Sequence, residues 1–292
     1  MRRLTFGCPA WLPTALARSA RRATWLLLLL ITTAAGGCGK PATGPTSPSA
    51  TAGTGGWHLV FSDDFSSSGA LDPGKWDYEI GYIRNSEAQF YTSRPENVRA
   101  EAGHLVIEAR KEPYQGYSYT SASVNTRGRF EFLYGRVEVR AKLPGGNGMW
   151  PAVWMLGANR AQVGWPACGE IDVMENVGFD PFTIHGTIHT AAYNHTLGTQ
   201  KSATITVANP SDDFHVYAME WYPDRIDIFV DGQKYFTFRN ENTGSQTWPF
   251  DKPQYLLINL AIGGSWGGQH GIDDARFPQR YLIDYVRVYS QN

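Results

Sequence analysis

The sequence predicts an all-β domain of the sandwich or barrel class across residues 57–292. Short runs alternate between apolar and polar residues, as in residues 136–142, where Val137, Val139 and Ala141 face one side. The chain has 31 glycines and no long stretch of helical period, which argues against a helical bundle. Its 292 residues are 42% hydrophobic and 13% aromatic, enough to bury a large core.

The alternating runs can be placed in order along the chain. Asp231 and Gly232 separate residues 225–230 from residues 233–238. An Asp-Gly pair fits the two-residue turn of a β-hairpin, so these two runs are expected to pair. Further strands are expected at residues 104–110, 119–125, 136–142, 150–156, 170–175, 214–221, 255–261 and 280–289.

The net charge of −1 conceals an uneven distribution. Six of the 26 basic residues and none of the 27 acidic ones precede Asp63, which leaves 20 basic against 27 acidic residues after that point. A nucleic-acid-binding domain would carry a basic face. We therefore expect no nucleic-acid partner for the acidic domain.

Residues 1–38 have the pattern of an export signal. Three arginines precede a 13-residue apolar run at residues 23–35, which suits a signal peptide and is too short for a membrane span. Small residues and then Cys38 follow, and this order resembles a bacterial lipoprotein signal, in which the cysteine carries lipid. The alternative is a secretory signal cut near Ala35. Either way we expect an exported bacterial protein, secreted or anchored to the cell envelope.

Residues 39–56 are rich in Pro, Gly, Ser, Thr and Ala and are predicted to be a flexible linker. Beyond them Cys168 is the only cysteine. An exported domain with one cysteine forms no internal disulfide, so its core must stabilise it. We expect residues 57–292 to be a single, monomeric domain.

Three carboxylates lie within six residues, at Glu170, Asp172 and Glu175. Residues two apart in a strand share a face, so Glu170 and Asp172 point the same way. Glu175 has the opposite phase unless the strand contains a one-residue bulge. The pair Val173-Met174 supplies the extra residue that such a bulge needs.

Such a cluster has three interpretations. Mutual repulsion raises at least one pKa, and glycoside cleavage needs one protonated and one ionised carboxyl. A calcium site and a solvated acidic edge strand are the alternatives. The flanking residues Trp165, Cys168, Ile171 and Met174 disfavour an exposed edge.

Four tryptophans occur near glycines and turns, where an indole could stack on a sugar ring. Trp150 and Trp154 share a strand face at this spacing and could act together. Each tryptophan taken alone could equally belong to the core. The four are Trp150, Trp154, Trp165 and Trp266.

The stretch Gly-Glu-Ile-Asp-Val-Met-Glu at residues 169–175 resembles the signature of glycoside hydrolase family 16 in its bulged, laminarinase form (Glu-Ile-Asp-x-x-Glu). The similarity extends over essentially all of residues 57–292. Further motifs similar to this family lie at residues 61–65, 85–92, 134–144, 148–156, 185–189, 248–259 and 284–289.

The resemblance implies a β-jelly-roll sandwich, concanavalin A-like, of two antiparallel sheets with a substrate cleft across the concave sheet. It implies that Glu170 is the nucleophile, that Glu175 is the acid/base and that Asp172 hydrogen-bonds the nucleophile. Cleavage would retain the anomeric configuration through a glycosyl-enzyme intermediate, which requires carboxyls about 5–5.5 Å apart. No cofactor is implied for catalysis.

The resemblance also implies supporting residues. His189 would lie beside the catalytic strand, although a purely structural histidine is the alternative. The glycine-rich residues 263–271 would form a rim of the cleft. The implied substrate-binding residues are Arg84, Asn85, Trp150, Trp154, Trp165, Asn259 and Trp266.

Many family members bind one structural calcium ion on the convex face. By position its ligands here would be Asp64, the Gly103 carbonyl and Asp284, and oxygen ligands suit Ca²⁺. Asp284 could instead be an ordinary carboxylate of a strand end. His185 and His189 could share a strand face, but no third ligand for a zinc ion is evident.

The function that the resemblance implies is an exported, retaining endo-β-1,3-glucanase whose partner is β-glucan polysaccharide. The bulged motif is compatible with mixed-linkage β-1,3-1,4-glucan as a second substrate. Alternatives on the same fold are a dedicated mixed-linkage glucanase, a galactan hydrolase and a transglycosylase. A non-catalytic glucan-binding protein is disfavoured because both Glu170 and Glu175 are present.

Overall fold

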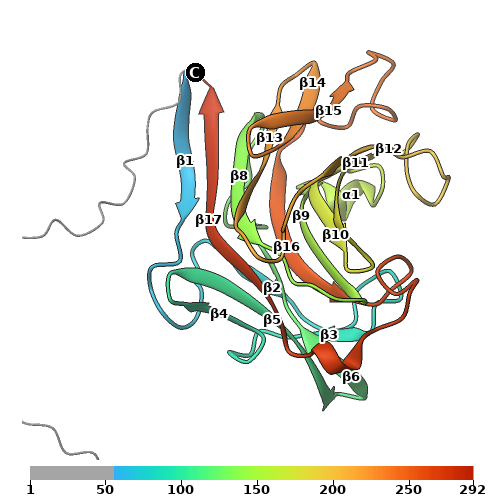
Figure 1. Cartoon of the computed structure of the whole chain (residues 1–292). Coiled ribbons are helices and arrows are strands. Elements are labelled where there is room, and N and C mark those ends of the chain that lie inside the picture. The colour runs from blue at the N-terminus through green and yellow to red at the C-terminus, as the bar shows by residue number, and fades with distance from the viewer. Residues whose placement is uncertain (1–55, 292) are drawn as a thin grey trace, which may run out of the picture. The chain divides into compact units, whose positions relative to one another are not determined.

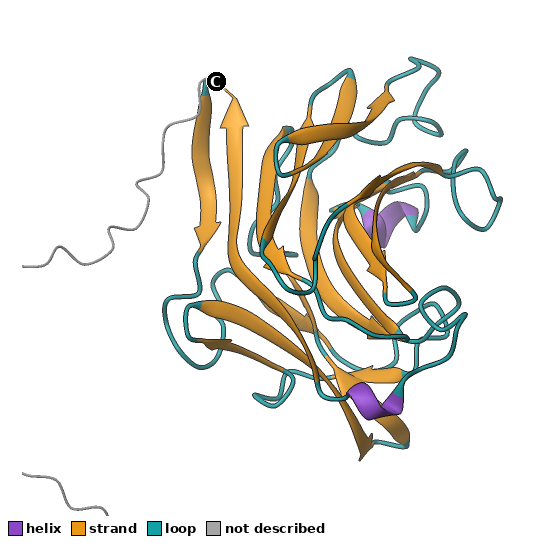
Figure 2. Ribbon diagram, in the orientation of Figure 1, coloured by secondary structure: helices purple, strands orange, loops and turns teal. Residues whose placement is uncertain are grey.

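The computed structural model describes residues 56–291, and their regular structure is almost entirely β (Figures 1 and 2). Seventeen strands are joined by one short helix, α1 (Arg160–Val163), and one 3-10 turn, η1 (Asp274–Arg276). The expected export signal, Cys38 and all but the last residue of the expected linker lie outside the described residues. Within residues 56–291 no helix is long and apolar enough to span a membrane.

Ten strands form the larger sheet: β1 (Trp57–Asp63), β3 (Gln89–Tyr91), β4 (Val98–Glu101), β5 (His104–Tyr114), β6 (Tyr117–Ser121), β8 (Gly135–Lys142), β13 (His215–Trp221), β14 (Arg225–Val230), β15 (Gln233–Arg239) and β17 (Gln279–Gln291). Their order is β15-β14-β13-β8-β17-β5-β6-β3, with β1 beside β17 and β4 beside β5. All pairs are antiparallel except β3 with β6. The first and last strands therefore pair with each other, which Figure 1 shows.

Seven strands form the smaller sheet: β2 (Asp77–Glu79), β7 (Ser123–Asn125), β9 (Met149–Gly157), β10 (Glu170–Val177), β11 (Asp180–His189), β12 (Lys201–Thr206) and β16 (Gln254–Ile262). Their order is β12-β11-β10-β9-β16-β7-β2. Helix α1 lies beside β9 to β11, on the side turned away from the larger sheet (Figure 1). The two sheets confirm the expected all-β jelly-roll sandwich.

The main core fills the space between the two sheets. Its residues follow the period-2 rule, so Val137 and Val139 reach it from β8 while Val153, Ile171 and Ile258 reach it from the smaller sheet. All five are fully buried. Burial of an aliphatic side chain of this size stabilises the fold by about 1.5–3 kcal/mol.

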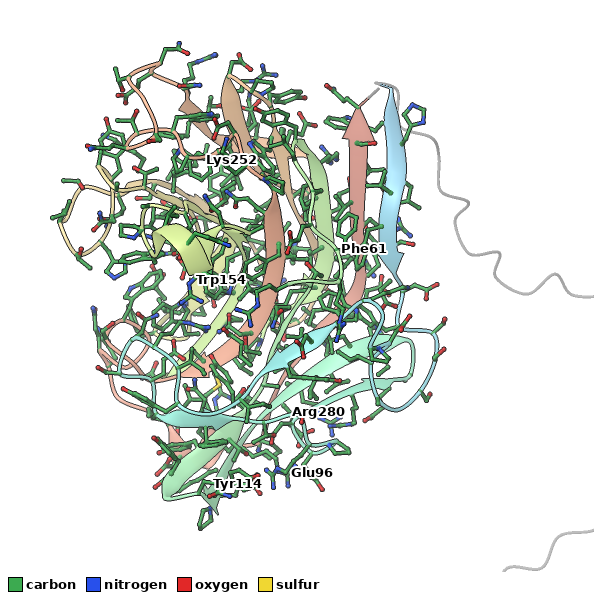
Figure 3. All side chains as sticks on the ribbon, turned by 180° about the vertical axis from the view of Figure 1, so that it is seen from behind. Phe61, Glu96, Tyr114, Trp154, Lys252 and Arg280 are labelled. Atoms are coloured by element: carbon green, nitrogen blue, oxygen red, sulfur yellow. The ribbon has the colours of Figure 1, made fainter. Side chains whose placement is uncertain are left out.

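The smaller sheet is buried on its other face as well. Every residue of β9 and of β16 is buried, because alternate side chains enter separate clusters. Trp154, Tyr255 and Leu257 form one cluster on this second face, and Trp150 forms another with Ala261. Figure 3 places Trp154 by this sheet, away from Phe61 on β1.

Most of the expected strands are present, with different ends. The run at residues 119–125 is divided, because the chain leaves the larger sheet after β6 and enters the smaller one at β7. The hairpin at Asp231-Gly232 is confirmed, with φ of 49° and 79° at its two turn residues. Cys168 is a buried free thiol. Strands β1 to β4, β11 and β12 were not among the expected runs, since they are short or lack strict alternation.

A test of this packing lies at Gly178, between β10 and β11. Its N–H donates to the Met149 carbonyl at 2.8 Å. A Cβ here would lie 1.7 Å from the Gly146 carbonyl oxygen, so the backbone would have to move. We expect Gly178→Ala to lower the free energy of unfolding by about 3 kcal/mol in a denaturant titration.

Gly145→Ala is the matched control for this substitution. The nearest atom to its added Cβ is the Ser211 hydroxyl oxygen at 3.4 Å. We expect a change within about 0.5 kcal/mol. Equal effects of the two substitutions would contradict the close approach of the backbones at Gly178.

Candidate active site

The three carboxylates project from one face of β10, an interior strand between β9 and β11. Opposite β9 the register shifts between Asp172 and Met174, which is the bulge that the spacing predicted. Val173 and Met174 both enter the core, so two successive residues face inward and Glu175 returns to the outer face. The solvated-edge interpretation of the cluster is therefore wrong.

An indole N–H is directed at each glutamate. Trp165 Nε1 donates to Glu170 Oε2 at 2.9 Å, and Trp150 Nε1 donates to Glu175 Oε1 at 3.0 Å. Each bond leaves the second oxygen of its carboxyl group available for chemistry. The tryptophans thus orient the two carboxyls in addition to lining the site.

His189 joins the remaining carboxylate to the site. It lies opposite Glu170 in the register of β10 with β11. Its Nε2 is 3.3 Å from Asp172 Oδ2 and 3.6 Å from Glu170 Oε1. The hydrogen bond expected between Asp172 and Glu170 stays a prediction, and Asp172 Oδ2 faces the His189 ring. Asp172 acts on Glu170 through its charge.

The electrostatics of the cluster favour protonation. Burial raises the pKa of Glu170, and the neighbouring charge of Asp172 raises it further, while His189 and the Trp165 N–H act in the opposite direction. Burial and Asp172 likewise raise the pKa of Glu175. Burial raises the pKa of Asp172. Three carboxyls this close and this dry cannot all be ionised near neutral pH, so the site holds at least one proton for an acid.

Two cavities of about 230 and 380 Å³ meet at the glutamates. Glu170 and Glu175 line both, and Asp172 lines the first. The structure thus brings the expected substrate-binding residues into one cleft. Arg84, Asn85, Trp150, Trp154, Trp165 and Asn259 line the first cavity, and Trp266 lines the second with Asn85 and Trp150.

A hydrogen-bonded network fixes Trp154 in the first cavity. Its Nε1 donates to Asn259 Oδ1 at 2.7 Å, and Asn259 Nδ2 donates to the Tyr91 hydroxyl at 2.9 Å. That hydroxyl donates to Glu87 Oε2 at 3.0 Å. The Arg84 guanidinium lies 4.9 Å above the Trp154 ring, a cation–π distance.

Several residues that line the cleft were not predicted from the sequence. Thr187 lies between His185 and His189 on the same strand face, so the period of two could have found it. The buried Glu87 and the loop residue His195 have no such signal, because their position depends on tertiary contacts. The other lining residues not predicted are Ala152, Leu156, Arg160, His185, Gln200 and Ser202, whereas Ser265 belongs to the glycine-rich stretch that was expected at the rim.

One group of described side chains has the spacing of metal ligands. Ligand atoms of Glu170, Asp172 and His189 lie within 4.8 Å of one another. This group contains His189 but not His185, so the two histidines form no pair on one ion. The carboxylate chemistry described above already explains why these three residues lie close together.

The residues expected to hold calcium converge at one edge of β17. Strand β1 ends at Asp63 opposite Val286, and β5 begins its pairing at Leu105 opposite Ile283. Asp64 follows the end of β1 and Gly103 precedes β5, so both lie in segments that adjoin β17 near Asp284, and the calcium site stays a prediction. The Asp284 carboxylate also pairs with Arg140 Nη1 at 2.6 Å.

Comparison with known proteins gives concordant matches. Residues 85–287 match the family described as Glycosyl hydrolases family 16. The beta-glucanase of Rhodothermus marinus is 52% identical over an alignment of 244 positions, and the alignment covers 80% of this chain and 85% of that protein. The X-ray structure of the laminarinase from Rhodothermus marinus has 50% identity and a TM-score of 0.78, over 80% of this chain and 97% of that one.

A second solved structure is similar to the same degree. SCLam, a non-specific endo-beta-1,3(4)-glucanase from family GH16, has 50% identity and a TM-score of 0.78 over 82% of this chain and 92% of that one. The family match covers the bulged strand and every residue that lines the two cavities except Arg84. The chain belongs to glycosyl hydrolase family 16.

Proposed function

We propose that this protein is an endo-β-1,3-glucanase that hydrolyses laminarin-like glucans. The observation that carries the proposal is the bulged strand β10, which presents Glu170, Asp172 and Glu175 on the wall of one cleft. The similarity to a beta-glucanase and to solved laminarinases supports the choice of β-1,3-glucan. A cleft formed by two joined cavities supports cleavage within a chain.

The proposed reaction has two displacements. Ionised Glu170 attacks the anomeric carbon while protonated Glu175 gives its proton to the leaving oxygen. Glu175, now ionised, takes a proton from water, and this water releases the sugar from Glu170 with net retention. The Trp165 N–H and His189 stabilise Glu170 as an anion. The charge of Asp172 keeps Glu175 protonated until it acts.

Mixed-linkage β-1,3-1,4-glucan is the second candidate substrate. The bulged motif is compatible with it, and SCLam, which is similar to this chain, is a non-specific endo-beta-1,3(4)-glucanase. A transglycosylase would use the same covalent intermediate and pass the sugar to another sugar. A galactan hydrolase would differ in the sugars that the cleft accepts.

We also propose that the protein is exported and acts as a monomer, secreted or held at the cell envelope by lipid on Cys38. The apolar run before Cys38 supports export. Mass spectrometry of the protein from a native membrane fraction tests the anchor. A diacylglyceryl group on Cys38 is expected, and a chain cut near Ala35 contradicts it.

The first prediction concerns the two glutamates. Glu170→Gln and Glu175→Gln should each lower kcat on laminarin by at least about a thousandfold, because each removes one partner of the double displacement. Products are measured by a reducing-end assay and by mass, on laminarin, barley mixed-linkage glucan, lichenan and agarose. Proton NMR of early products should show retention at the anomeric carbon.

Glu96→Gln is the matched control, since Glu96 is exposed and far from Trp154 in Figure 3. It should retain wild-type activity. Cleavage of mixed-linkage glucan alone, or of agarose alone, would keep the mechanism and overturn the substrate. Full activity of Glu170→Gln or of Glu175→Gln would overturn the mechanism.

The second prediction concerns pH. Asp172→Asn removes a negative neighbour that raises the pKa of Glu175. Ionisation of Glu175 then becomes easier, and the acid form is lost at lower pH. The alkaline limb of the kcat/KM profile should move down by about one pH unit. A limb that stays in place or moves upward would contradict the coupling of these two carboxyls.

The third prediction concerns calcium, which we propose binds at Asp64, the Gly103 carbonyl and Asp284. Calcium bound only by the folded protein should raise Tm by several degrees over the protein in chelator. Asp64→Asn should abolish that increase, while activity on laminarin persists. An equal increase in this variant, or none in the wild type, would argue that Arg140 is the partner of Asp284.

A further inference from the structure

His195 occupies a distinctive place in the cleft. Only five of the described residues line both cavities. Four of them are Asn85, Trp150, Glu170 and Glu175, which were all expected from the sequence, and the fifth is His195. Because the cavities meet at the glutamates, a residue that lines both lies where the glycosidic bond must be held.

The loop that carries His195 is organised around its neighbour Asn194. This side chain is only 2% exposed, although it lies in a surface loop. Its Nδ2 donates to the Thr190 carbonyl at 3.1 Å, and its Oδ1 accepts from the Thr196 hydroxyl at 2.5 Å. Its backbone carbonyl accepts from the N–H groups of Leu197 and Thr199 at 3.1 Å each. These bonds fix the backbone on both sides of His195.

The neighbouring chain holds the loop in place. The Ala192 N–H donates to the Gln246 carbonyl at 2.9 Å, and the Tyr193 hydroxyl contacts the carboxylate of Glu241 at 2.9 Å. The Lys201 ammonium lies 4.2 Å from the Tyr193 ring. The loop is thus anchored outside the cleft, so a substrate need not order it.

The His195 ring rests on the two residues that hold Glu170. Its centroid is 5.0 Å from that of Trp165 and 5.2 Å from that of His189, with the planes at 33° and 87°. The histidine is nevertheless solvent-exposed in part, so its remaining ring edge is free to meet a ligand. The imidazole thus contacts the two side chains that contact Glu170, and it lines both cavities together with that glutamate.

We propose that His195 is a substrate-contacting residue that hydrogen-bonds hydroxyl groups of the sugars on both sides of the bond to be cleaved. This inference rests on the proposed function. A neutral imidazole has one donor and one acceptor, which suits two sugar hydroxyls at once. Burial, and then the charge of His189, lower the pKa of His195, which favours that neutral form. The ligand is a neutral β-glucan chain that spans both cavities.

The experiment measures binding without turnover. In a Glu175→Gln background, which leaves both ring contacts of His195 intact, calorimetry gives the Kd of a six-unit β-1,3-glucan oligosaccharide. Adding His195→Ala should weaken binding about tenfold, since two hydrogen bonds to the sugars are lost. His195→Gln keeps a donor and an acceptor and should recover part of the affinity. In otherwise wild-type protein, His195→Ala should lower kcat/KM by a similar factor.

Two further variants distinguish a direct contact between His195 and the sugars from an effect on the stability of the loop. Leu197→Ala is the control, because Leu197 is 61% exposed in the same loop and lines neither cavity. It should bind as the parent does. Asn194→Ala releases the loop and should reproduce the loss, with little further effect when His195→Ala is added. Thermal melting of every variant identifies any that is unfolded.

The outcomes distinguish this inference from the proposed function. Wild-type cleavage of laminarin together with unchanged oligosaccharide affinity in His195→Ala would overturn the role of His195 and leave the glucanase intact. An affinity loss of the same size in Leu197→Ala would also overturn it. A wild-type protein that neither cleaves nor binds β-1,3-glucan would overturn the proposed function and this inference with it.

Discussion

The structure depends on one constraint, which is that three carboxyl groups must be held together on a nearly dry strand face. Burial and mutual repulsion both oppose their ionisation. The local solution is a bulge that sends Val173 and Met174 together into the core. Two indole N–H groups donate to the glutamates, and the His189 imidazole lies beside Asp172 from the neighbouring strand. The free-energy cost of holding the three carboxyl groups together is thus offset by apolar packing on the opposite face of the same strand.

This arrangement explains why the central strands β9 and β16 of the smaller sheet are buried on both faces. Its inner face contacts the larger sheet, and its outer face carries the tryptophans that orient the glutamates. A strand with solvent on one side could not exclude water from the carboxyls, and their pKa values would remain ordinary. The larger sheet contributes no side chain to either cavity, so it acts on the chemistry by fixing the backbone of β9, β10 and β16.

The parts of the site that the sequence predicted are those with a local signal. The spacing of Glu170, Asp172 and Glu175 predicted both the bulge and the shared face, because a strand has a fixed period. The division of residues 119–125 between two sheets has no such signal, since both halves alternate in the same way. The side-chain partner of Asp172 could not be predicted either. That partner is His189, which depends on the register of β10 with β11.

The place of His195 in the cleft could not be predicted from the sequence either, because it depends on how its loop folds. Strand β10, which carries both Glu170 and Glu175, is fixed by the core, so the carboxylates cannot move without disturbing the sandwich. The loop that carries His195 has its own anchor in Asn194, and its imidazole contacts Trp165 and His189 at the cleft. Its sequence can therefore change while the carboxylates stay in place. A cleft built in this way separates the residues that break the bond from those that choose the sugar, and substrate preference is then determined by loops.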